Sequence, residues 1–572
     1  MIKKAIKYIF SDTMKKKIMV SAPICFAITF SIIIFGPFDL FLHNKAEFPF
    51  CLGEVISSFL IAAFVVFIIG LFIVLVIPKA VSEIVICILS GLLLSSYIQI
   101  LFLNKGNIVI TKGKETFNLY IYIAIFVVPL TMYIISKIWK NDFWRKATIF
   151  FPSLIFIMQF SGLISAAITN ESGYSQTKEL YYFSYEEQFK MSSEENIIVF
   201  ILDRLDTMFL EEALEKYPDI SDALVGFTFY TNNVSTGLYT YPSIVNMITG
   251  EPYTNEITRE EYLTSAWNNA QLFDILHEYD YSVNMLMDGV SMYYSPKDVL
   301  NKVDNIKTTD ISNRAVNHGT VVKYMVSFSI ARHAPLIMNA SLDSYTPFAI
   351  EKFVTITGVP DYFPPYITAK SDLLYYDKLK ETKLSLDSSK STFSFMHLNS
   401  AHAPYGYDEN LNPVLAKDAR MYPQIRGSFK ILEEYFAQLK ELGIYDSSTI
   451  IIIADHGEIP SWSMNGNKLA SGLNNRPLTS LLIKPKNSDD TPLGINTTAE
   501  LSSANFIATI LDIIGADTEE FGPSWFAIAK DNLPQTRILE LYLFQGLFVA
   551  NYGGKYEITG NAHNPDNWRF SR

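Results

Sequence analysis

Five long apolar stretches open the chain, at residues 18–35, 55–78, 84–103, 117–136 and 147–168. None of them contains Lys, Arg, Asp or Glu. Each approaches or exceeds the roughly 20 residues that a helix needs to cross a hydrocarbon core of about 30 Å. Five such runs packed together are not expected of buried helices in a soluble domain. The pattern therefore predicts an α-helical membrane domain over residues 1–168, with five transmembrane helices.

Beyond residue 168 the pattern of apolar positions changes. Residues 169–195 are polar with scattered aromatic side chains, and we interpret them as a juxtamembrane linker. From residue 196 onward, apolar runs at 197–202, 392–398, 449–454 and 478–483 predict strands, and a helix from residue 243 and helices at 267–279 and 424–442 lie between them. This alternation predicts an α/β domain over residues 196–572, with a mainly parallel sheet covered by helices. Residues 293–375 are interpreted as an insertion that shapes the substrate pocket.

Lysine and arginine are distributed unevenly among the short loops between the apolar stretches. The N-terminus and the second and fourth loops carry 11 of these residues, and the first and third loops carry 4. Positively charged loops stay in the cytoplasm, so this bias places the N-terminus there. An odd number of spans then puts residues 169–572 outside the cell. The first stretch lacks a small-x-small cleavage site and continues through Gly36-Pro37-Phe38-Asp39, so we interpret it as a retained span.

Net charge divides the chain in the same place. Residues 1–170 hold 15 Lys and Arg against 7 Asp and Glu, whereas the remainder holds 31 against 51. Such acidity excludes nucleic acid as a partner of the outer domain, because phosphate backbones require a basic face. The three cysteines, Cys25, Cys51 and Cys87, lie in or beside the apolar stretches. The outer domain is therefore predicted to fold without disulfides, which favours a bacterium with a single membrane as the source.

Polar residues suited to a metal follow two of the predicted strands. Asp203 ends the run 196–202, and the run 448–453 leads into Ala454-Asp455-His456-Gly457-Glu458. In open α/β sheets, ligands bind outside the carboxyl ends of the strands. A carboxylate and an imidazole supply oxygen and nitrogen ligands for a divalent cation. Asp203, Asp455 and His456 are therefore the metal candidates, with Asp206 as a weaker one.

A hydroxyl nucleophile is a candidate in the peptide Tyr239-Thr240-Tyr241-Pro242-Ser243. Thr240 precedes a predicted helix N-terminus, where backbone N–H groups and the helix dipole favour an anion. A threonine hydroxyl needs a metal or a base to become nucleophilic. The alternative role for Thr240 is that of an N-cap, and Ser235, Thr236 and Ser243 are competing hydroxyls.

Asp203, Thr240-x-Pro242-Ser243, His402-Ala403-Pro404-Tyr405 and Asp455-His456-Gly457-Glu458 follow one another along the chain. Their order resembles that of the alkaline phosphatase superfamily. Within it, the chain resembles the sulfatase-like branch that includes lipoteichoic acid synthases and phosphoethanolamine transferases. The resemblance covers residues 196–525 and includes a late strand segment at 476–484 and a helical segment at 503–515.

The resemblance implies a role for each of these residues. Thr240 would be the covalent nucleophile and a fourth metal ligand beside Asp203, Asp455 and His456, and His402 would contact the transferred group or protonate the leaving oxygen. One divalent ion is implied, with Mn²⁺ favoured by the resemblance and Zn²⁺ or Mg²⁺ as alternatives.

Three further residues refine this picture. Thr240 stands where hydrolytic sulfatases carry the Cys or Ser that matures to formylglycine, a group that threonine cannot form. This difference favours phosphoryl transfer over sulfate ester cleavage. Arg204 follows Asp203 where such sulfatases have a second acid, which resembles the transferase branch. His397, on the strand before His402, is interpreted as an ordinary core histidine.

These observations predict a membrane-anchored, metal-dependent phosphotransferase. It would move phosphoglycerol or phosphoethanolamine from a membrane phospholipid, through phosphothreonine, to a cell-surface glycan or teichoic-type polymer. Its partners would be the lipid bilayer, the phospholipid donor and that acceptor. The first alternative is an extracellular phosphodiesterase or sulfatase-like hydrolase with water as acceptor. The second is a non-catalytic membrane sensor or scaffold on the same fold.

Overall fold

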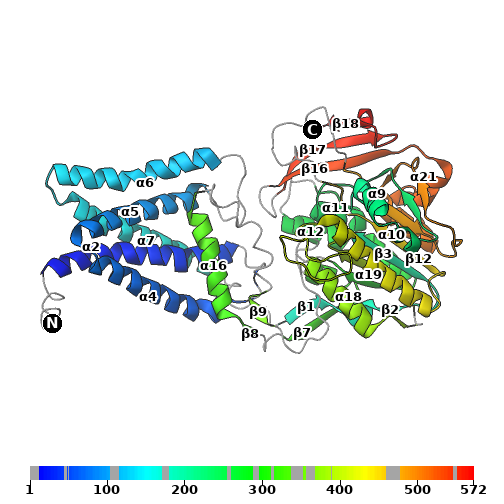
Figure 1. Cartoon of the computed structure of the whole chain (residues 1–572), viewed down its shortest axis with the longest axis horizontal. Coiled ribbons are helices and arrows are strands. Elements are labelled where there is room, and N and C mark those ends of the chain that lie inside the picture. Colours follow the sequence, from blue (N-terminus) through cyan, green and yellow to red (C-terminus); the bar gives the residue numbers. More distant parts are fainter. Residues whose placement is uncertain are drawn as a thin grey trace. The chain divides into compact units, whose positions relative to one another are not determined.

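The computed structural model describes residues 12–43, 48, 50–103, 115–169, 179–253, 259–287, 296–310, 315–335, 352–355, 368–387, 390–458, 477–544 and 550–571. The chain forms two compact units (Figure 1). The first comprises Met1–Lys178, Asp310–Gly358 and Gln545–Leu547. The second comprises Glu179–Thr309, Val359–Phe544 and Phe548–Arg572. The boundaries expected at residues 168/169 and 195/196 remain predictions.

Five helices of the first unit are long and apolar enough to cross a membrane. The first runs through α2 (Asp12–Thr29), a π-helical turn (Phe30–Phe35) and α3 (Gly36–His43). The others are α4 (Leu52–Val76), α5 (Lys79–Ile98) with a second π-helical turn (Gln99–Leu103), α6 (Glu115–Ile138) and α7 (Phe143–Thr169). The five expected apolar helices are confirmed. The first helix also continues past Gly36, as its apolar pattern predicts.

A helix from the middle of the chain packs against these apolar helices. This helix, α16 (His318–His333), contacts α3, α4, α5 and the first π-helical turn. Arg332 of α16 forms an ion pair with Asp39 of α3 at 2.8 Å, and a Cβ atom on Gly36 would collide with Ser329. Residues 315–335 and 352–355 of the expected insertion thus belong to the first unit. The expected role of residues 293–375 in shaping a substrate pocket stays a prediction.

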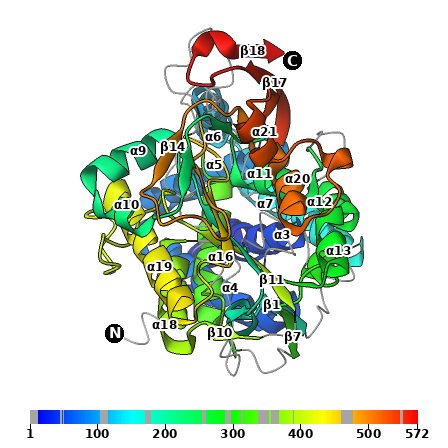
Figure 2. The same cartoon turned by 90° about the vertical axis from the view of Figure 1, so that its right-hand side faces the viewer.

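A seven-stranded sheet forms the centre of the second unit (Figure 2). Its strand order is β14-β4-β13-β12-β3-β11-β6. The bounds are β3 (Asn196–Leu202), β4 (Thr228–Tyr230), β6 (Tyr281–Leu286), β11 (Ser391–Leu398), β12 (Ser448–Ile453), β13 (Leu481–Lys484) and β14 (Gly494–Asn496). Only β13 pairs antiparallel, with β12 and β4, so the mainly parallel sheet is confirmed. The neighbouring strands β12, β3 and β11 are parallel and end at the same edge.

Helices cover both faces of this sheet (Figure 2). One group contains α9 (Thr207–Lys216), α10 (Asp219–Ala223), α18 (Ala369–Thr382) and α19 (Met421–Glu441). The other contains α11 (Thr240–Thr249), α12 (Arg259–Asn269), α13 (Gln271–Glu278) and α20 (Phe506–Ile514). Every residue of β3 and β12 is buried between them. This burial explains why both strands are continuous apolar runs in the sequence.

The helix expected at residues 267–279 is wrong, because two helices occupy this stretch. α12 ends at Asn269 and α13 begins at Gln271, with Ala270 in an extended conformation between them. Asparagine has a low helix propensity, which favours the break. Trp267 stacks on Phe273 across it, with ring centroids 5.4 Å apart. Both short helices bury apolar side chains. The spacing of apolar residues across the break is therefore similar to that of one continuous amphipathic helix.

A three-stranded antiparallel sheet lies beside the loop that precedes Thr240. It consists of β16 (Thr536–Phe544), β17 (Ala550–Thr559) and β18 (Trp568–Ser571). The Glu540 N–H of β16 donates to the Thr236 carbonyl oxygen at 2.8 Å. The shorter elements are β1 (Glu179–Phe183), α8 (Tyr185–Gln188), β2 (Lys190–Met191), β5 (Asn233–Val234), α15 (Pro296–Val299), β7 (Ile306–Asp310), β8 (Ala315–Val316), β9 (Val354–Thr355), β10 (Ser385–Leu386), β15 (Leu501–Ser502) and α21 (Trp525–Asp531).

Candidate active site

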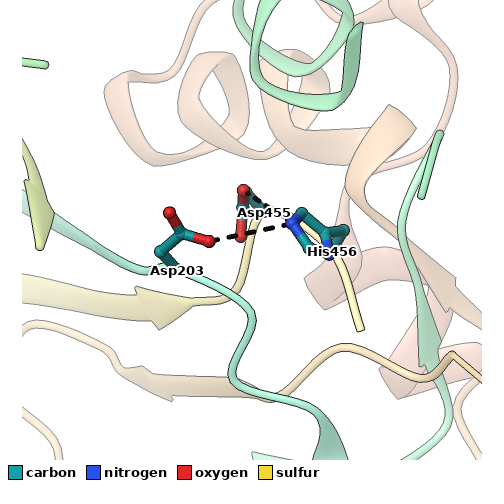
Figure 3. A group of neighbouring side chains, drawn as sticks. All are labelled: Asp203, Asp455 and His456. Carbon is teal, nitrogen blue, oxygen red and sulfur yellow. Dashed lines mark ion pairs between the residues drawn. The ribbon is translucent and has the colours of Figure 1, made fainter. Parts of the chain in front are cut away.

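Three of the candidate metal ligands meet beyond the carboxyl ends of β3 and β12 (Figure 3). One ligand atom from each of Asp203, Asp455 and His456 lies within 4.8 Å of the other two. His456 Nε2 is 3.7 Å from Asp203 Oδ1 and 3.6 Å from Asp455 Oδ2. The side chains are buried, because the two strands are adjacent and helices cover both faces of the sheet. The three residues that the strand-end rule singled out therefore lie close together, and their role as metal ligands stays a prediction.

The atoms of this cluster that face one another are suited to bind a cation. His456 Nδ1 lies 2.7 Å from the Gly457 carbonyl oxygen, which can only accept, so in the neutral imidazole Nδ1 carries the proton and Nε2 presents a lone pair. Asp203 Oδ1 and Asp455 Oδ2, which face that lone pair, have no hydrogen-bond partner among the residues that the structure describes. Buried acceptors that face one another are unfavourable unless a cation lies between them. The three residues thus fit a divalent metal as two oxygen ligands and one nitrogen ligand.

Histidine side chains surround the Asp203 carboxylate. Burial alone would raise the pKa of Asp203, but His402, His397 and His456 together lower it to about 2. His397 Nε2 lies 3.5 Å from Asp203 Oδ2, so His397 belongs to the site and not only to the core. The pairing of β11 with β3 sets His397 opposite Ile201, close to Asp203 in the register. The sequence does not show which residues of β11 and β3 pair, so the contact between His397 and Asp203 was not predicted.

A buried hydrogen-bond network holds the loop that carries His402. The Asp372 carboxylate of α18 accepts from the Asn399 N–H at 2.8 Å, the Ser400 N–H at 3.3 Å and the Tyr407 hydroxyl at 2.7 Å. Asn399 Nδ2 in turn donates to the His402 carbonyl oxygen at 2.8 Å. Burial raises the pKa of Asp372 to about 7. This network fixes the backbone on which His402 stands.

Thr240 is the first residue of α11, and the N-cap position belongs to Tyr239, which makes no side-chain cap bond. Two competing hydroxyls donate to backbone carbonyl groups, Ser235 at 2.6 Å and Thr236 at 3.5 Å. The third competitor, Ser243, is fully buried. Thr240 is partly exposed at the helix N-terminus. These contacts make Thr240 the most accessible hydroxyl of the four, and its catalytic role stays a prediction.

Asp206, the weaker metal candidate, supports the loop that carries the ligands. Its carboxylate accepts from the Met208 N–H at 3.0 Å, as the N-cap of α9, and from the Glu458 N–H at 2.9 Å. Burial raises the pKa of Asp206 to about 7. A Cβ atom on Gly457 would lie 2.7 Å from Asp206 Oδ2 and from the backbone of Pro477, so this close approach requires glycine.

A family model places the chain among known proteins. The model of the sulfatase family matches residues 195–516, which is more than half of the chain. The chain belongs to the sulfatase family. The superfamily expected from the order of the motifs is thereby confirmed, and the sulfatase match covers every residue of the metal cluster. Members of this family use a divalent metal, which agrees with the buried Asp203, Asp455 and His456.

Solved structures resemble this sulfatase-family chain at low sequence identity, and no curated protein sequence matches it. The PsFucS1 sulfatase from Pseudoalteromonas sp. is 13% identical, with a TM-score of 0.39 over 66% of this chain and 82% of that one. The lipoteichoic acid synthase LtaP from Listeria monocytogenes is 11% identical, with a TM-score of 0.36 over 68% and 88%. The lipooligosaccharide phosphoethanolamine transferase EptA from Neisseria meningitidis is 14% identical, with a TM-score of 0.34 over 89% and 98%. The family assignment rests on the sequence match.

Proposed function

We propose that this sulfatase-family protein is a membrane-anchored phosphotransferase. It would move phosphoglycerol or phosphoethanolamine from a phospholipid to a hydroxyl of a cell-surface glycan or teichoic-type polymer. The observation that carries the proposal is the buried cluster of Asp203, Asp455 and His456 in a chain with five membrane-length apolar helices. A site for a divalent metal suits ester chemistry, and the helices would keep it close to lipid head groups. Thr240 supports phosphoryl transfer over sulfatase chemistry, because it cannot form formylglycine.

Each residue has a distinct task in the proposed first step. Thr240 Oγ1, its proton lost to solvent, attacks the phosphorus of the lipid phosphodiester. The bond between phosphorus and the diacylglycerol oxygen breaks, and protonated His402 gives its proton to that oxygen. In the first turn of α11, the N–H groups of Thr240 and Tyr241 have no intrahelical acceptor and would stabilise a phosphoryl oxygen, whereas Pro242 has no N–H. A divalent metal held by Asp203, Asp455 and His456 would lower the pKa of the Thr240 hydroxyl and neutralise charge on the phosphoryl group.

The second step returns Thr240 to its starting state. Neutral His402 takes the proton of the acceptor hydroxyl, whose oxygen attacks the phosphothreonine. The bond between phosphorus and Thr240 Oγ1 breaks, and the threonine oxygen regains a proton from solvent. Mn²⁺ is our first choice of metal, and Zn²⁺ and Mg²⁺ also suit two carboxylates and an imidazole.

We further propose that the N-terminus lies in the cytoplasm and the catalytic domain outside a bacterial cell. Packing within the first unit supports opposite sides for the N-terminus and for the chain that follows the last apolar helix, and the charge bias supports the cytoplasm for the N-terminus. α16, which follows the last apolar helix in the sequence, contacts α3 at the end of the first helix that the charge bias places outside. Lys17, near the opposite end of that helix, donates to the carbonyl oxygens of Leu75 and Ile77. Among the described residues, no membrane-length apolar helix separates α7 from α16.

Dependence on an acceptor distinguishes transfer from hydrolysis. The full chain, loaded with Mn²⁺ in vesicles of phosphatidylglycerol or phosphatidylethanolamine, should release diacylglycerol several-fold faster when a hydroxyl-bearing polymer is added. The lipid head group should then appear on the polymer, because the acceptor resolves the phosphothreonine. Release of free head-group phosphate at the same rate without the polymer would establish the hydrolase instead. Cleavage of sulfate esters without any lipid turnover would contradict the proposal.

A further inference from the structure

Arg204 adopts a backbone conformation that favours glycine. It directly follows the metal candidate Asp203 and has a φ of 59°, in the left-handed region. Its N–H donates to Asp455 Oδ1 at 2.9 Å, so this conformation joins the two strand ends that carry the metal cluster. Glycine would make the same backbone bond with less strain. Strained residues of this kind persist where function requires them, so the arginine side chain needs its own explanation.

The guanidinium of Arg204 extends to the loop that carries His456. Its Nη2 atom lies 2.5 Å from Glu458 Oε2. The two side chains are 22% and 25% exposed, unlike the buried metal cluster below them. Glu458 uses only one guanidinium nitrogen, and the buried Arg204 Nε–H finds no hydrogen-bond partner among the described residues. The guanidinium as a whole is partly exposed, so its outer N–H groups can meet a ligand from solvent.

The loop that carries His402 contributes a third side chain, Tyr405. Tyr405 lies three residues after His402. Burial raises the pKa of Tyr405, while the charge on Arg204 lowers it and the charge on Glu458 raises it further. Both charged side chains are thus close enough to Tyr405 to influence its ionisation. We call Arg204, Glu458 and Tyr405 the rim, since each belongs to a loop that also carries Asp203, His402 or His456.

We propose that the rim is an anion subsite in which the Arg204 guanidinium binds a non-bridging phosphate oxygen of the substrate. Glu458 holds the guanidinium in place before the substrate arrives. The planar guanidinium suits this task because its parallel N–H groups match the oxygens of a phosphate. The subsite rests on the proposed function for its substrate, a phosphate ester. It adds a residue to the site that none of the motifs had marked as a ligand-binding group.

Arg204→Gly is the decisive variant, because glycine suits the backbone and keeps the N–H bond to Asp455. Binding of inorganic phosphate to the Mn²⁺-loaded full chain in detergent micelles should be measured by calorimetry. Arg204→Gly should bind phosphate at least 10-fold more weakly than the unaltered chain, with an unchanged melting temperature and one bound Mn²⁺. Arg204→Lys should recover part of the affinity. Glu458→Gln keeps an acceptor that holds the guanidinium and removes a negative charge beside the anion, so it should bind phosphate at least as tightly as the unaltered chain.

Lys383→Gly is the matched control. Lys383 is also a cation at a left-handed position, with a φ of 60° at the end of α18, and it has no place in the site. The Lys383→Gly variant should bind phosphate with the same affinity as the unaltered chain. The subsite is overturned if the unaltered chain binds no phosphate, if Arg204→Gly binds it with full affinity, or if Arg204→Gly loses Mn²⁺ as well. If the proposed function fails but the subsite holds, the result differs from these. Thr240 would carry no phosphate group after incubation with lipid, and the rim would still bind inorganic phosphate.

Discussion

Thr240→Ala should lower lipid turnover by about 10⁴-fold or more, because it would remove the atom that we propose as the nucleophile of the covalent step. The free energy of unfolding should change by less than about 0.5 kcal/mol, since Thr240 is the first helical residue and not the N-cap, and alanine suits the first turn of a helix. Turnover of phosphatidylglycerol or phosphatidylethanolamine and the melting temperature should be measured on the same preparation.

Thr249→Ala is the control for this substitution, as it makes the same change at the other end of α11. The Thr249 hydroxyl donates to the Val245 carbonyl oxygen at 2.7 Å, so this variant should lose some stability and keep its turnover. A Thr240→Ala protein that melts early but still turns over lipid would make Thr240 a structural residue. The nucleophile would then be Ser235, Thr236 or Ser243.

Asp455→Ala and His456→Ala should each weaken Mn²⁺ binding by more than about 100-fold and reduce turnover to background. Each change removes one of the three ligands of the buried cluster. Without metal, Asp455→Ala should stay folded, because the relief of repulsion between two buried carboxylates offsets the loss of the hydrogen bond from the Arg204 N–H. Added Mn²⁺ should stabilise the unaltered chain by about 2.7 kcal/mol at 100 times the dissociation constant, and the variants hardly at all.

Asp304→Asn provides the comparison for these variants. Asp304 lies 3.1 Å from His277 in the same unit, so it forms another pair of carboxylate and imidazole. Both side chains of this pair are partly exposed. Among the residues that the structure describes, no further ligand completes a cluster of three with them. Asp304→Asn should leave Mn²⁺ binding unchanged. Full Mn²⁺ occupancy in a chain that carries both Asp455→Ala and His456→Ala would remove these residues from the metal site.

The parts of the fold that depend on local burial were predictable from the sequence. The strands β3 and β12 are buried on both faces, so they appear as unbroken apolar runs at 196–202 and 448–453. Their polar ends followed from the rule that parallel strands present ligands at their carboxyl ends. The five apolar helices were equally clear, because only a membrane-length helix needs about 20 residues without a charge.

The parts that depend on distant contacts were not predictable. His397 reaches Asp203 through the register of β11 against β3, and the sequence does not encode that register in any local pattern. Asp372 supports the His402 loop from α18, about 30 residues away, and resembles any other helical aspartate in sequence. The packing of α16 against α3 depends on the small size of Gly36 and the pairing of Arg332 with Asp39. These contacts exist only once the chain has folded.

The covalent step at Thr240 is the central claim, and mass spectrometry of its peptide tests it most directly. The Mn²⁺-loaded full chain should be incubated with phosphatidylglycerol or phosphatidylethanolamine, quenched rapidly without an acceptor, and digested. The peptide that contains Thr240 should carry the head-group phosphate of the lipid supplied, and the mass of the adduct should change with that lipid. The adduct should be absent from Thr240→Ala and from metal-free protein. Steady release of diacylglycerol with the adduct on another residue, or with no adduct at all, would contradict a phosphothreonine mechanism.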